Sequence, residues 1–340
     1  MLDFVIASLG LVILLIAGDS LVRGAVNLSL RLGVPALIVS LTIVAFGTSA
    51  PELLISVRAV LEGVPGLAMG NVVGSNTANI LLVLGVPALL KGLDTAGCDT
   101  SHNYVYMILA TVLFIGLAFG GQFGWPQGII LLAGLALMLT SAFREAQTHR
   151  REVKAQLAAE LTAKGEALDP DALEAQAEAE EEGEVEGVDP DMAWWKVLLF
   201  LGLGLIGLPL GADILVDSST NIARHYGVSE TVIGLTLVAI GTSLPELATT
   251  VMAAYRRQAD VALGNVIGSN MFNLLAIIGV ASMVGPLPVE PKLLMFDLWV
   301  MLAASLLIAP FVFRGWHMGR AWGIVFAGLY MVYLLAVLNH

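Results

Sequence analysis

The sequence predicts an all-α integral membrane protein of ten transmembrane helices, arranged as two inverted five-helix repeats. Of its 340 residues, 57% are hydrophobic and only 13% are charged, and the mean hydropathy is +0.86. Such a composition leaves too little polar surface to coat a soluble globule. The other two observations are a series of apolar runs of helix length and an internal repeat that carries buried acidic residues. About ten crossings of roughly 20 residues each fit within this length.

The apolar runs predict where the helices lie. They are separated by short polar or Gly/Pro-containing turns and fall near residues 3–31, 35–61, 66–90, 103–119, 126–143, 193–224, 228–255, 261–285, 294–313 and 319–338. The first run is interpreted as a retained helix, because Asp3 stands where a signal peptide would carry basic residues. We therefore divide the chain into a first repeat (1–144), a linker (145–192) and a second repeat (193–340).

The acidic residues behind the net charge of −12 crowd into the linker, which is rich in Ala and Glu. This composition is typical of a solvated connection, part of which could form an exposed helix. Weak cation sensing is the alternative, although Asp169-Pro170-Asp171 lacks the glycine and the spaced oxygens of an EF-hand loop. The single cysteine, Cys98, excludes an intrachain disulfide.

Basic residues predict the orientation, since loops retained in the cytoplasm are enriched in Lys and Arg. With the linker in the cytoplasm, most of the basic residues lie on or toward that side, among them Arg23, Arg31, Lys91, Arg144, Arg150, Arg151, Lys196, Arg256, Arg257, Arg314 and Arg320. Both termini are then extracytoplasmic. We expect a multi-pass protein of the plasma (inner) membrane.

Two motifs recur at an offset of 194 residues and define the repeat. Residues 45–53 (AFGTSAPEL) return at 239–247 (AIGTSLPEL), and residues 70–79 (GNVVGSNTAN) return at 264–273 (GNVIGSNMFN). Five helices is an odd number, so the second half enters the membrane from the opposite side. Inverted repeats are typical of secondary transporters, whose ion sites lie at the midplane where the halves meet.

The first motif places one glutamate of each half, Glu52 and Glu246, inside an apolar span, where an ionisable side chain is costly and usually functional. A divalent cation between two carboxylates satisfies both, which suits Ca²⁺. A protonated, hydrogen-bonded pair is the structural alternative. The proline before each glutamate breaks the helix and releases backbone carbonyls, and neighbouring Thr and Ser hydroxyls add neutral oxygens.

The second motif combines glycines at four-residue spacing with polar side chains. Gly70 with Gly74, and Gly264 with Gly268, are predicted to let helices approach closely. Ser75 and Asn79 share a helix face, as do Ser269 and Asn273, and can direct oxygens toward the broken helices. For the remaining asparagines we favour hydrogen bonding between helices over ion ligation: Asn71, Asn76, Asn265 and Asn270.

Together these motifs resemble the two alpha-repeat motifs of the Na⁺/Ca²⁺ exchanger family, within the calcium/cation antiporter superfamily. The resemblance covers the chain apart from the linker and implies an antiporter with a diamond of four cation sites. It implies that Ca²⁺ is bound by the carboxylates of Glu52 and Glu246 and the carbonyls of Thr48 and Thr242. The implied flanking Na⁺ sites use Ala45, Ser49 and Ser75, and Ala239, Ser243 and Ser269, while Asn79 and Asn273 complete the middle.

One departure concerns Asn273, where several exchangers of this family carry Asp. With two midplane carboxylates, the counter-ion stays open between Na⁺, H⁺ and K⁺. The hydroxyl-rich motifs favour Na⁺, and a Ca²⁺/H⁺ or K⁺-dependent antiporter is the alternative. Asp19 and Asp213 are expected to be structural, for example through an ion pair with Arg23.

Other function classes fit less well. An intramembrane hydrolase needs an activated nucleophile or a catalytic metal, but the five histidines fall near helix ends or loops, away from the repeated serines. A passive channel does not need inverted broken helices. We therefore expect no enzyme activity and no cofactor beyond the transported Ca²⁺ and Na⁺. The expected surroundings are the lipid bilayer, with no nucleic acid and no required protein partner.

Overall fold

The structure is a computed structural model that describes residues 2–339 except Gly33, Gly97, Asp99, 165–191 and 228–238. The first half contains α1 (Leu2–Leu32), α2 (Ala36–Val39), the π-helix η1 (Ser40–Val44), α3 (Ala45–Thr48), α4 (Ala50–Leu61), α5 (Pro65–Ala78), the π-helix η2 (Asn79–Val83), α6 (Gly85–Leu90), α7 (Ser101–Ala118) and α8 (Trp125–Lys164).

The second half repeats this order. It contains α10 (Trp194–His225), α12 (Ala239–Gly241), α13 (Leu244–Tyr255), α14 (Ala259–Met271), the π-helix η4 (Phe272–Ile277), α15 (Ile278–Val284), the π-helix η5 (Leu293–Asp297), α16 (Leu298–Leu307), α17 (Ala309–Arg314) and α18 (Arg320–Asn339). Two short strands, β1 (Gln122–Phe123) and β2 (Leu287–Pro288), pair antiparallel and join the loop between α7 and α8 in the first half to the loop between α15 and η5 in the second.

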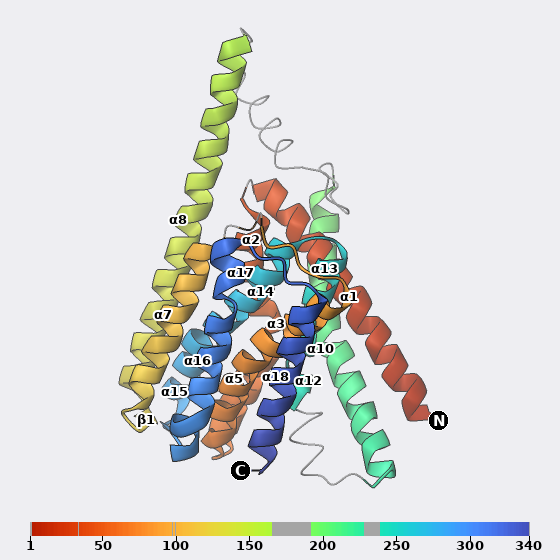
Figure 1. Cartoon of the computed structure of the whole chain (residues 1–340), viewed down its shortest axis with the longest axis vertical. Helices are drawn as coiled ribbons and strands as arrows, with labels where there is room; N and C mark the ends of the chain where they lie inside the picture. The colour runs from red at the N-terminus through yellow and green to blue at the C-terminus, as the bar shows by residue number, and fades with distance from the viewer. Residues whose placement is uncertain are drawn as a thin grey trace.

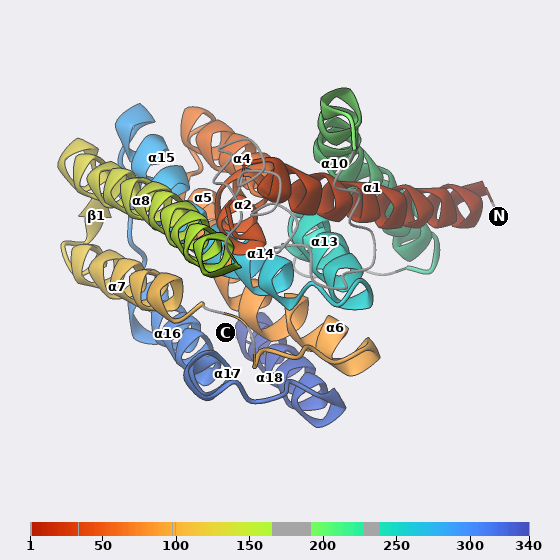
Figure 2. The ribbon, with the colours of Figure 1, turned by 90° about the horizontal axis from the view of Figure 1, so that it is seen from above.

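The predicted all-α membrane fold is confirmed. Within the described residues, eight helices are long and apolar enough to cross a membrane, and α2 to α4 form a further span that bends by 43°. The predicted helix at 228–255 begins outside the described residues, and its described part is α12 and α13. The spans built on α14 and α5 are the most buried, so the second repeated motif of each half lies at the centre of the bundle (Figure 2).

Helix α8 is longer than the predicted apolar run, which ends near residue 143. It continues to Lys164 and projects beyond the bundle (Figure 1). The added turns are rich in Ala, Glu, Gln and Lys and contain no Gly or Pro, so these strong helix formers continue the helix into solvent. The first part of the predicted linker is therefore helical, while residues 165–191 lie outside the described part of the chain.

Helices α1 and α10 run side by side at one edge of the molecule (Figure 1, Figure 2). Glycines bring their backbones together, because a methyl group on Gly24 would lie 2.8 Å from the Leu201 backbone nitrogen, and one on Gly204 would lie 2.5 Å from the Leu21 Cβ. Most of their buried apolar side chains belong to a smaller hydrophobic cluster that also takes in Val39, Val44 and Ala248, while Val22 and Val26 of α1 belong to the main cluster of the bundle. The fold thus consists of a closely packed helix pair that rests on the bundle and shares part of its core.

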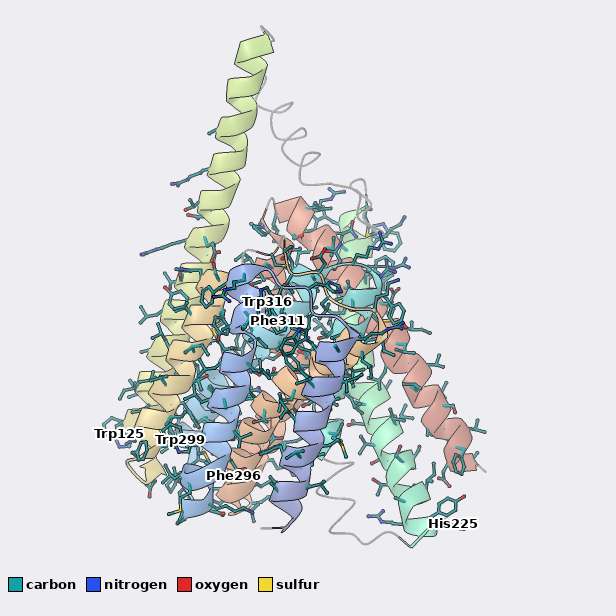
Figure 3. The ribbon with its side chains drawn as sticks, viewed as in Figure 1. Trp125, His225, Phe296, Trp299, Phe311 and Trp316 are labelled. Atoms are coloured by element: carbon teal, nitrogen blue, oxygen red, sulfur yellow. The ribbon has the colours of Figure 1, made fainter. Side chains whose placement is uncertain are left out.

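Large apolar side chains cover the outside of the molecule. Leu2, Leu54, Ile206 and Val332 are each more than 60% exposed, as expected for a surface in contact with lipid tails. Trp125 and Trp299 lie toward one end of the bundle and Trp316 toward the other (Figure 3). Tryptophan at both ends is typical of the two membrane–water interfaces.

Candidate ion-binding site

The two broken helices have nearly the same backbone geometry. Ser49 separates α3 from α4 with φ −86° and ψ 3°, and Ser243 precedes α13 with φ −89° and ψ 5°. In both helices a proline occupies the first turn, where its missing N–H costs nothing. Glu52 and Glu246 also lie in these first turns, next to the positive end of the helix dipole. The repeat thus presents two buried carboxylates in equivalent positions.

Side chains of both halves meet at these carboxylates, each of which belongs to a residue only 1% exposed. The Ser49 hydroxyl donates a hydrogen bond of 3.2 Å to Glu246 Oε1. The hydroxyls of Thr48 and Ser269 are also within hydrogen-bonding reach of the Glu246 carboxylate. Glu52 is close enough to Glu246 for the two charges to repel one another. An arrangement of this kind is stabilised by a cation.

Five buried oxygens of the two motifs have no hydrogen-bond partner among the residues that the structure describes. They are Glu52 Oε2, Glu246 Oε2, Asn79 Oδ1, Asn273 Oδ1 and Ser243 Oγ. Buried acceptors are normally satisfied, so an unsatisfied group in a native structure needs an explanation. Each of these oxygens belongs to a residue of the repeated motifs, and four of them form two pairs related by the repeat. They are the ligand type that hard cations prefer.

The second motif approaches this point from α5 and α14. The side chains of Ser75 and Asn79 and those of Ser269 and Asn273 are at most 4% exposed. The π-helix η2 begins at Asn79, and η4 contains Asn273. Wider turns of this kind occur frequently at functional sites. No composition or period in the sequence indicated them.

The predicted close approach through glycines holds for the second half. A methyl group on Gly264 would lie 2.9 Å from the Ser40 Cβ, and one on Gly268 would lie 2.5 Å from the Leu41 carbonyl oxygen and 2.6 Å from the Ala45 Cβ. This contact explains why Ala45 lies buried against α14. In the first half, a methyl group on Gly70 or Gly74 would meet no atom of the described residues within 4 Å, so the close approach predicted there stays a prediction.

The predicted bonds between helices are also present. Asn71 Nδ2 donates to Ser56 Oγ over 3.3 Å, and Asn265 Nδ2 donates to Thr250 Oγ1 over 3.3 Å, so equivalent asparagines bond equivalent positions. The Thr48 hydroxyl additionally donates to Asn265 Oδ1 over 3.2 Å. These asparagines hold the second motif against the first.

The remaining predicted residues lie at the edges of the site. Ala239 begins α12, and Thr242 lies in the turn between α12 and α13. Thr242 also lines a cleft of about 130 Å³ together with Pro51, Ile55, Pro209, Ala212, Asp213, Val216, Asp217, Gly241 and Pro245. The expectation that Asp213 is structural is therefore incomplete, because Asp213 and Asp217 form an acidic wall of a cleft that reaches the broken helix.

Asp19 does form the expected ion pair with Arg23, whose Nε lies 3.0 Å from Asp19 Oδ2. The sequence interpretation missed a second partner: Arg256, directly after α13, contacts Asp19 Oδ1 at 2.5 Å. Met252 of α13 also lies beside Gly18. This triad therefore ties α1 to α13. The one sign of this contact in the sequence was a difference between the repeats, since Arg256 aligns with Glu62, which has the opposite charge.

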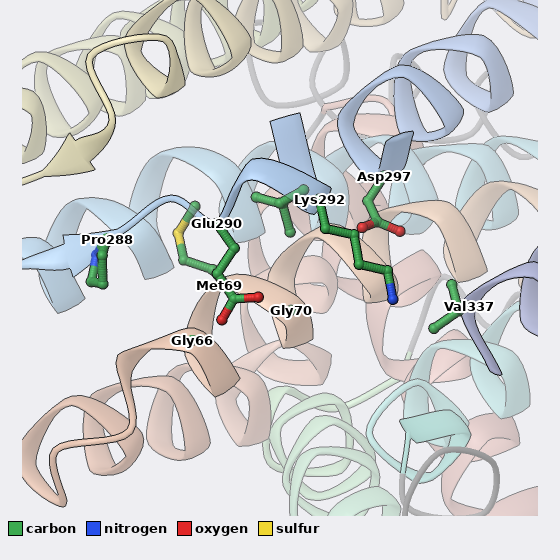
Figure 4. Close-up of a pocket in the computed structure, with 9 residues that line it drawn as sticks. Gly66, Met69, Gly70, Pro288, Glu290, Lys292, Asp297 and Val337 are labelled. Carbon is green, nitrogen blue, oxygen red and sulfur yellow. The ribbon is translucent and has the colours of Figure 1, made fainter. Parts of the chain in front are cut away.

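A second cleft, of about 170 Å³, is lined by neither Glu52 nor Glu246 (Figure 4). Glu290, Lys292 and Asp297 line it, and Asp297 accepts a hydrogen bond of 3.2 Å from the Tyr333 hydroxyl. Across the described residues, no three His, Cys, Asp or Glu side chains gather into a metal cluster. A cation held at Glu52 and Glu246 would therefore also depend on neutral oxygens.

The fold defines a membrane protein of inverted repeats, and this centre is a candidate cation site between its halves. The profile of the family described as sodium/calcium exchanger protein matches residues 2–144 and 196–339. The sodium/calcium exchanger MaX1 of Methanosarcina acetivorans is 34% identical over 345 residues, covering 98% of each chain. The chain belongs to the sodium/calcium exchanger family, which confirms the resemblance found in its motifs.

A solved structure agrees with this placement. That of the sodium-calcium exchanger NCX_Mj soaked with 2.5 mM Na⁺ and 0.1 mM Ca²⁺ superposes with a TM-score of 0.77 at 29% identity, covering 98% of both chains. A more distant relative, the Ca²⁺/H⁺ antiporter ChaA of Bacillus subtilis, is 25% identical over 236 residues, which covers 66% of this chain and 60% of ChaA. The family is one of transporters.

Proposed function

We propose that this protein exchanges Ca²⁺ for Na⁺ across a membrane, with both ions competing for the centre between Glu52 and Glu246. The observation that carries the proposal is the set of five buried, unpartnered oxygens contributed by both repeats. Ca²⁺ takes six to eight oxygen ligands and prefers carboxylates among them. Two carboxylates can neutralise one Ca²⁺.

The proposed ligands follow the repeat. Ca²⁺ would be bound by the carboxylates of Glu52 and Glu246 and the carbonyls of Thr48 and Thr242, with Asn79 and Asn273 completing the middle. Na⁺ would use the serine oxygens beside this centre together with the carbonyls of two alanines: Ser49, Ser75 and Ala45, and Ser243, Ser269 and Ala239. The only cofactor-like species this requires are the transported ions.

Two features support alternating access. Most buried apolar side chains of α1 and α10 belong to a cluster distinct from the main core, so most of that core can stay packed when the pair moves against the bundle. Asp213 and Thr242 line the same cleft, beside the part of α10 that leads to His225. On the other side, the ion-paired residues Asp19, Arg23 and Arg256 tie α1 to α13. We infer that the centre opens toward one side only in this conformation.

Sidedness follows from the basic residues. Arg31 donates to the Met192 carbonyl beside the linker, so this end of α1 and the start of α10 lie at the same face. If the linker is cytoplasmic, the Asp213 cleft faces the extracytoplasmic side of the plasma (inner) membrane. Ions would then enter from outside.

The test is ⁴⁵Ca²⁺ uptake into proteoliposomes with outward gradients of Na⁺, K⁺ and H⁺ applied separately. We expect an outward Na⁺ gradient to drive uptake. The second candidate is Ca²⁺/H⁺ exchange, favoured by the absence of a third carboxylate at Asn273 and by the distant relative ChaA. Uptake driven only by the H⁺ gradient would replace the proposal with this alternative, and uptake that needs K⁺ would add K⁺ as a transported ion.

A further inference from the structure

Two asparagines that are not among the proposed ligands form a reciprocal contact between the repeats. Asn76 Nδ2 donates to the backbone carbonyl of Asn270 over 3.2 Å, and Asn270 Nδ2 donates to the backbone carbonyl of Asn76 over 3.3 Å. Both residues are 1% exposed. We call this pair of residues the asparagine clasp. It joins α5 to α14 behind the glutamates.

The clasp determines which way its own amides point. A backbone carbonyl can only accept a hydrogen bond, so each clasp asparagine must present its NH₂ group to that carbonyl. Its Oδ1 is then left to accept a hydrogen bond from another residue of the opposite repeat. The orientation of each amide is thus set by a backbone carbonyl oxygen, which accepts hydrogen bonds and never donates them.

The clasp in turn orients two proposed ligands. Asn273 Nδ2 donates to Asn76 Oδ1 over 3.0 Å, and Asn79 Nδ2 donates to Asn270 Oδ1 over 3.0 Å. Because the NH₂ groups of Asn79 and Asn273 face the clasp, their Oδ1 atoms point away from it and are buried with no hydrogen-bond partner in the described part of the chain. The pairing crosses the repeats: a residue of one half orients the ligand of the other.

We propose that Asn76 and Asn270 are positioning residues that present oxygen, rather than NH₂, from Asn273 and Asn79 to the transported cation. This inference rests on the proposed function. Without the clasp, either amide could turn by 180° and direct a partial positive charge at the cation. Partners that orient metal ligands typically change metal affinity by about 10- to 100-fold when removed.

The experiment is isothermal titration of detergent-purified full-length protein with Ca²⁺ in Na⁺-free buffer, combined with thermal unfolding in the absence of ions. We expect Asn76→Leu and Asn270→Leu to raise the Kd for Ca²⁺ by about tenfold or more. The matched control is Thr77→Val, which removes a buried hydroxyl that bonds Val73 of its own helix. The control should leave the Kd within about twofold.

A double-mutant cycle separates positioning from general stability. If Asn76 acts through Asn273, then Asn76→Leu combined with Asn273→Leu should weaken Ca²⁺ binding no more than Asn273→Leu alone. The same Asn76→Leu change combined with Asn79→Leu should be additive. Full additivity in both cycles, or an unchanged Kd in Asn76→Leu, would overturn the positioning role.

Two further measurements separate a failure of the clasp from misfolding and from a failure of the proposed function. If a leucine variant does not fold, Asn76→Ser tests the same contact, because serine is polar but too short to reach both partners, and an unchanged Kd there also overturns the role. Wild-type protein that binds no Ca²⁺ would overturn the proposed function itself. Wild-type binding that is lost in Glu52→Gln but kept in Asn76→Leu would overturn only the clasp.

Discussion

The interface between α1 and α13 is closed, whereas the interface related to it by the repeat, between α10 and α4, is split by a cleft. A methyl group on Gly18 of α1 would lie only 3.0 Å from the Ala248 carbonyl of α13. The equivalent of Gly18 is Ala212, which lines the cleft beside Ile55 of α4. Two copies of one architecture therefore adopt different packings in the same molecule.

The charges at these interfaces differ as well. At the closed interface, Asp19 is held by Arg23 and Arg256. The residues at the equivalent positions of the open interface are Asp213, Asp217 and Glu62, all acidic. Closing the cleft would bring Asp213 and Asp217 against α4, whose one arginine, Arg58, already pairs with Glu62 at 2.6 Å. The repeat therefore sets the shape of both interfaces, while the charges substituted between its two copies favour closure of the interface between α1 and α13.

The largest loss of Ca²⁺ exchange is expected from substitutions at the centre between Glu52 and Glu246, where the two halves are most alike. Glu52→Gln and Glu246→Gln each remove a charged ligand but keep the side-chain volume, so each should reduce Ca²⁺ exchange in proteoliposomes by more than about tenfold. Size-exclusion profiles should be unchanged. Substantial exchange in only one variant would mean that the halves contribute unequally, and exchange in both would refute the site.

Breaking the ion pair at the closed interface should have the next largest effect. Asp19→Asn removes a partly buried charge that two arginines share, so opening of this side should become about five- to tenfold more frequent. The reporter is Ala248→Cys in a Cys98→Ala background, with the rate of modification by a membrane-impermeant thiol reagent as the measurement. Equal rates with and without Asp19→Asn would show that the triad does not hold the interface.

Cys98 itself should react slowly even where it is retained. Burial of this loop residue, and then the nearby Asp260 carboxylate, raise the pKa of the Cys98 thiol. Little thiolate is then present at neutral pH, and the thiolate is the reactive form. Modification of the otherwise unaltered protein should therefore be slow at pH 7 and accelerate as the pH rises. Rapid modification at pH 7 would show that partial burial does not protect the Cys98 thiol.

A smaller effect is expected at the acidic cleft. Asp213→Asn combined with Asp217→Asn should raise the Ca²⁺ concentration for half-maximal exchange by about two- to threefold at low ionic strength, because a charged mouth concentrates cations and salt screens it. Glu290→Gln, in the other cleft, is the matched control. An effect of equal size in the control, or no dependence on salt, would remove the acidic wall from the pathway.

The smallest effect is expected in the acidic linker. Changing Glu180, Glu181, Glu182 and Glu184 to Gln should leave exchange within about twofold of the wild type, because their composition is typical of a solvated connection, in which charges are screened. Both this segment and the cleft are acidic, so the two sets of substitutions separate the effect of local charge at the cleft from that of net charge. If Ca²⁺ stimulates exchange by the wild type but not by this variant, that loss would support the alternative of cation sensing by the linker.

Much of the fold could be predicted because its determinants are local. A membrane helix needs a continuous apolar run, and Pro51 and Pro245 interrupt the backbone hydrogen bonds wherever they lie. Two matching motifs with an odd number of helices between them also require inversion. The end of α8 could not be predicted from hydropathy, since the helix continues to Lys164 through residues that are polar but strongly helix-forming.

The amino-acid sequence by itself determined the membrane class, the repeat, the broken helices and the residue types of the ion site. Only the tertiary structure decided how these parts meet: the contact of Arg256 with Asp19, 237 residues apart, and the clasp that turns Asn79 and Asn273. The physical reason is that a repeat predicts equivalent positions but not which of two equivalent interfaces is closed. That choice depends on long-range packing and charge, which no local pattern encodes.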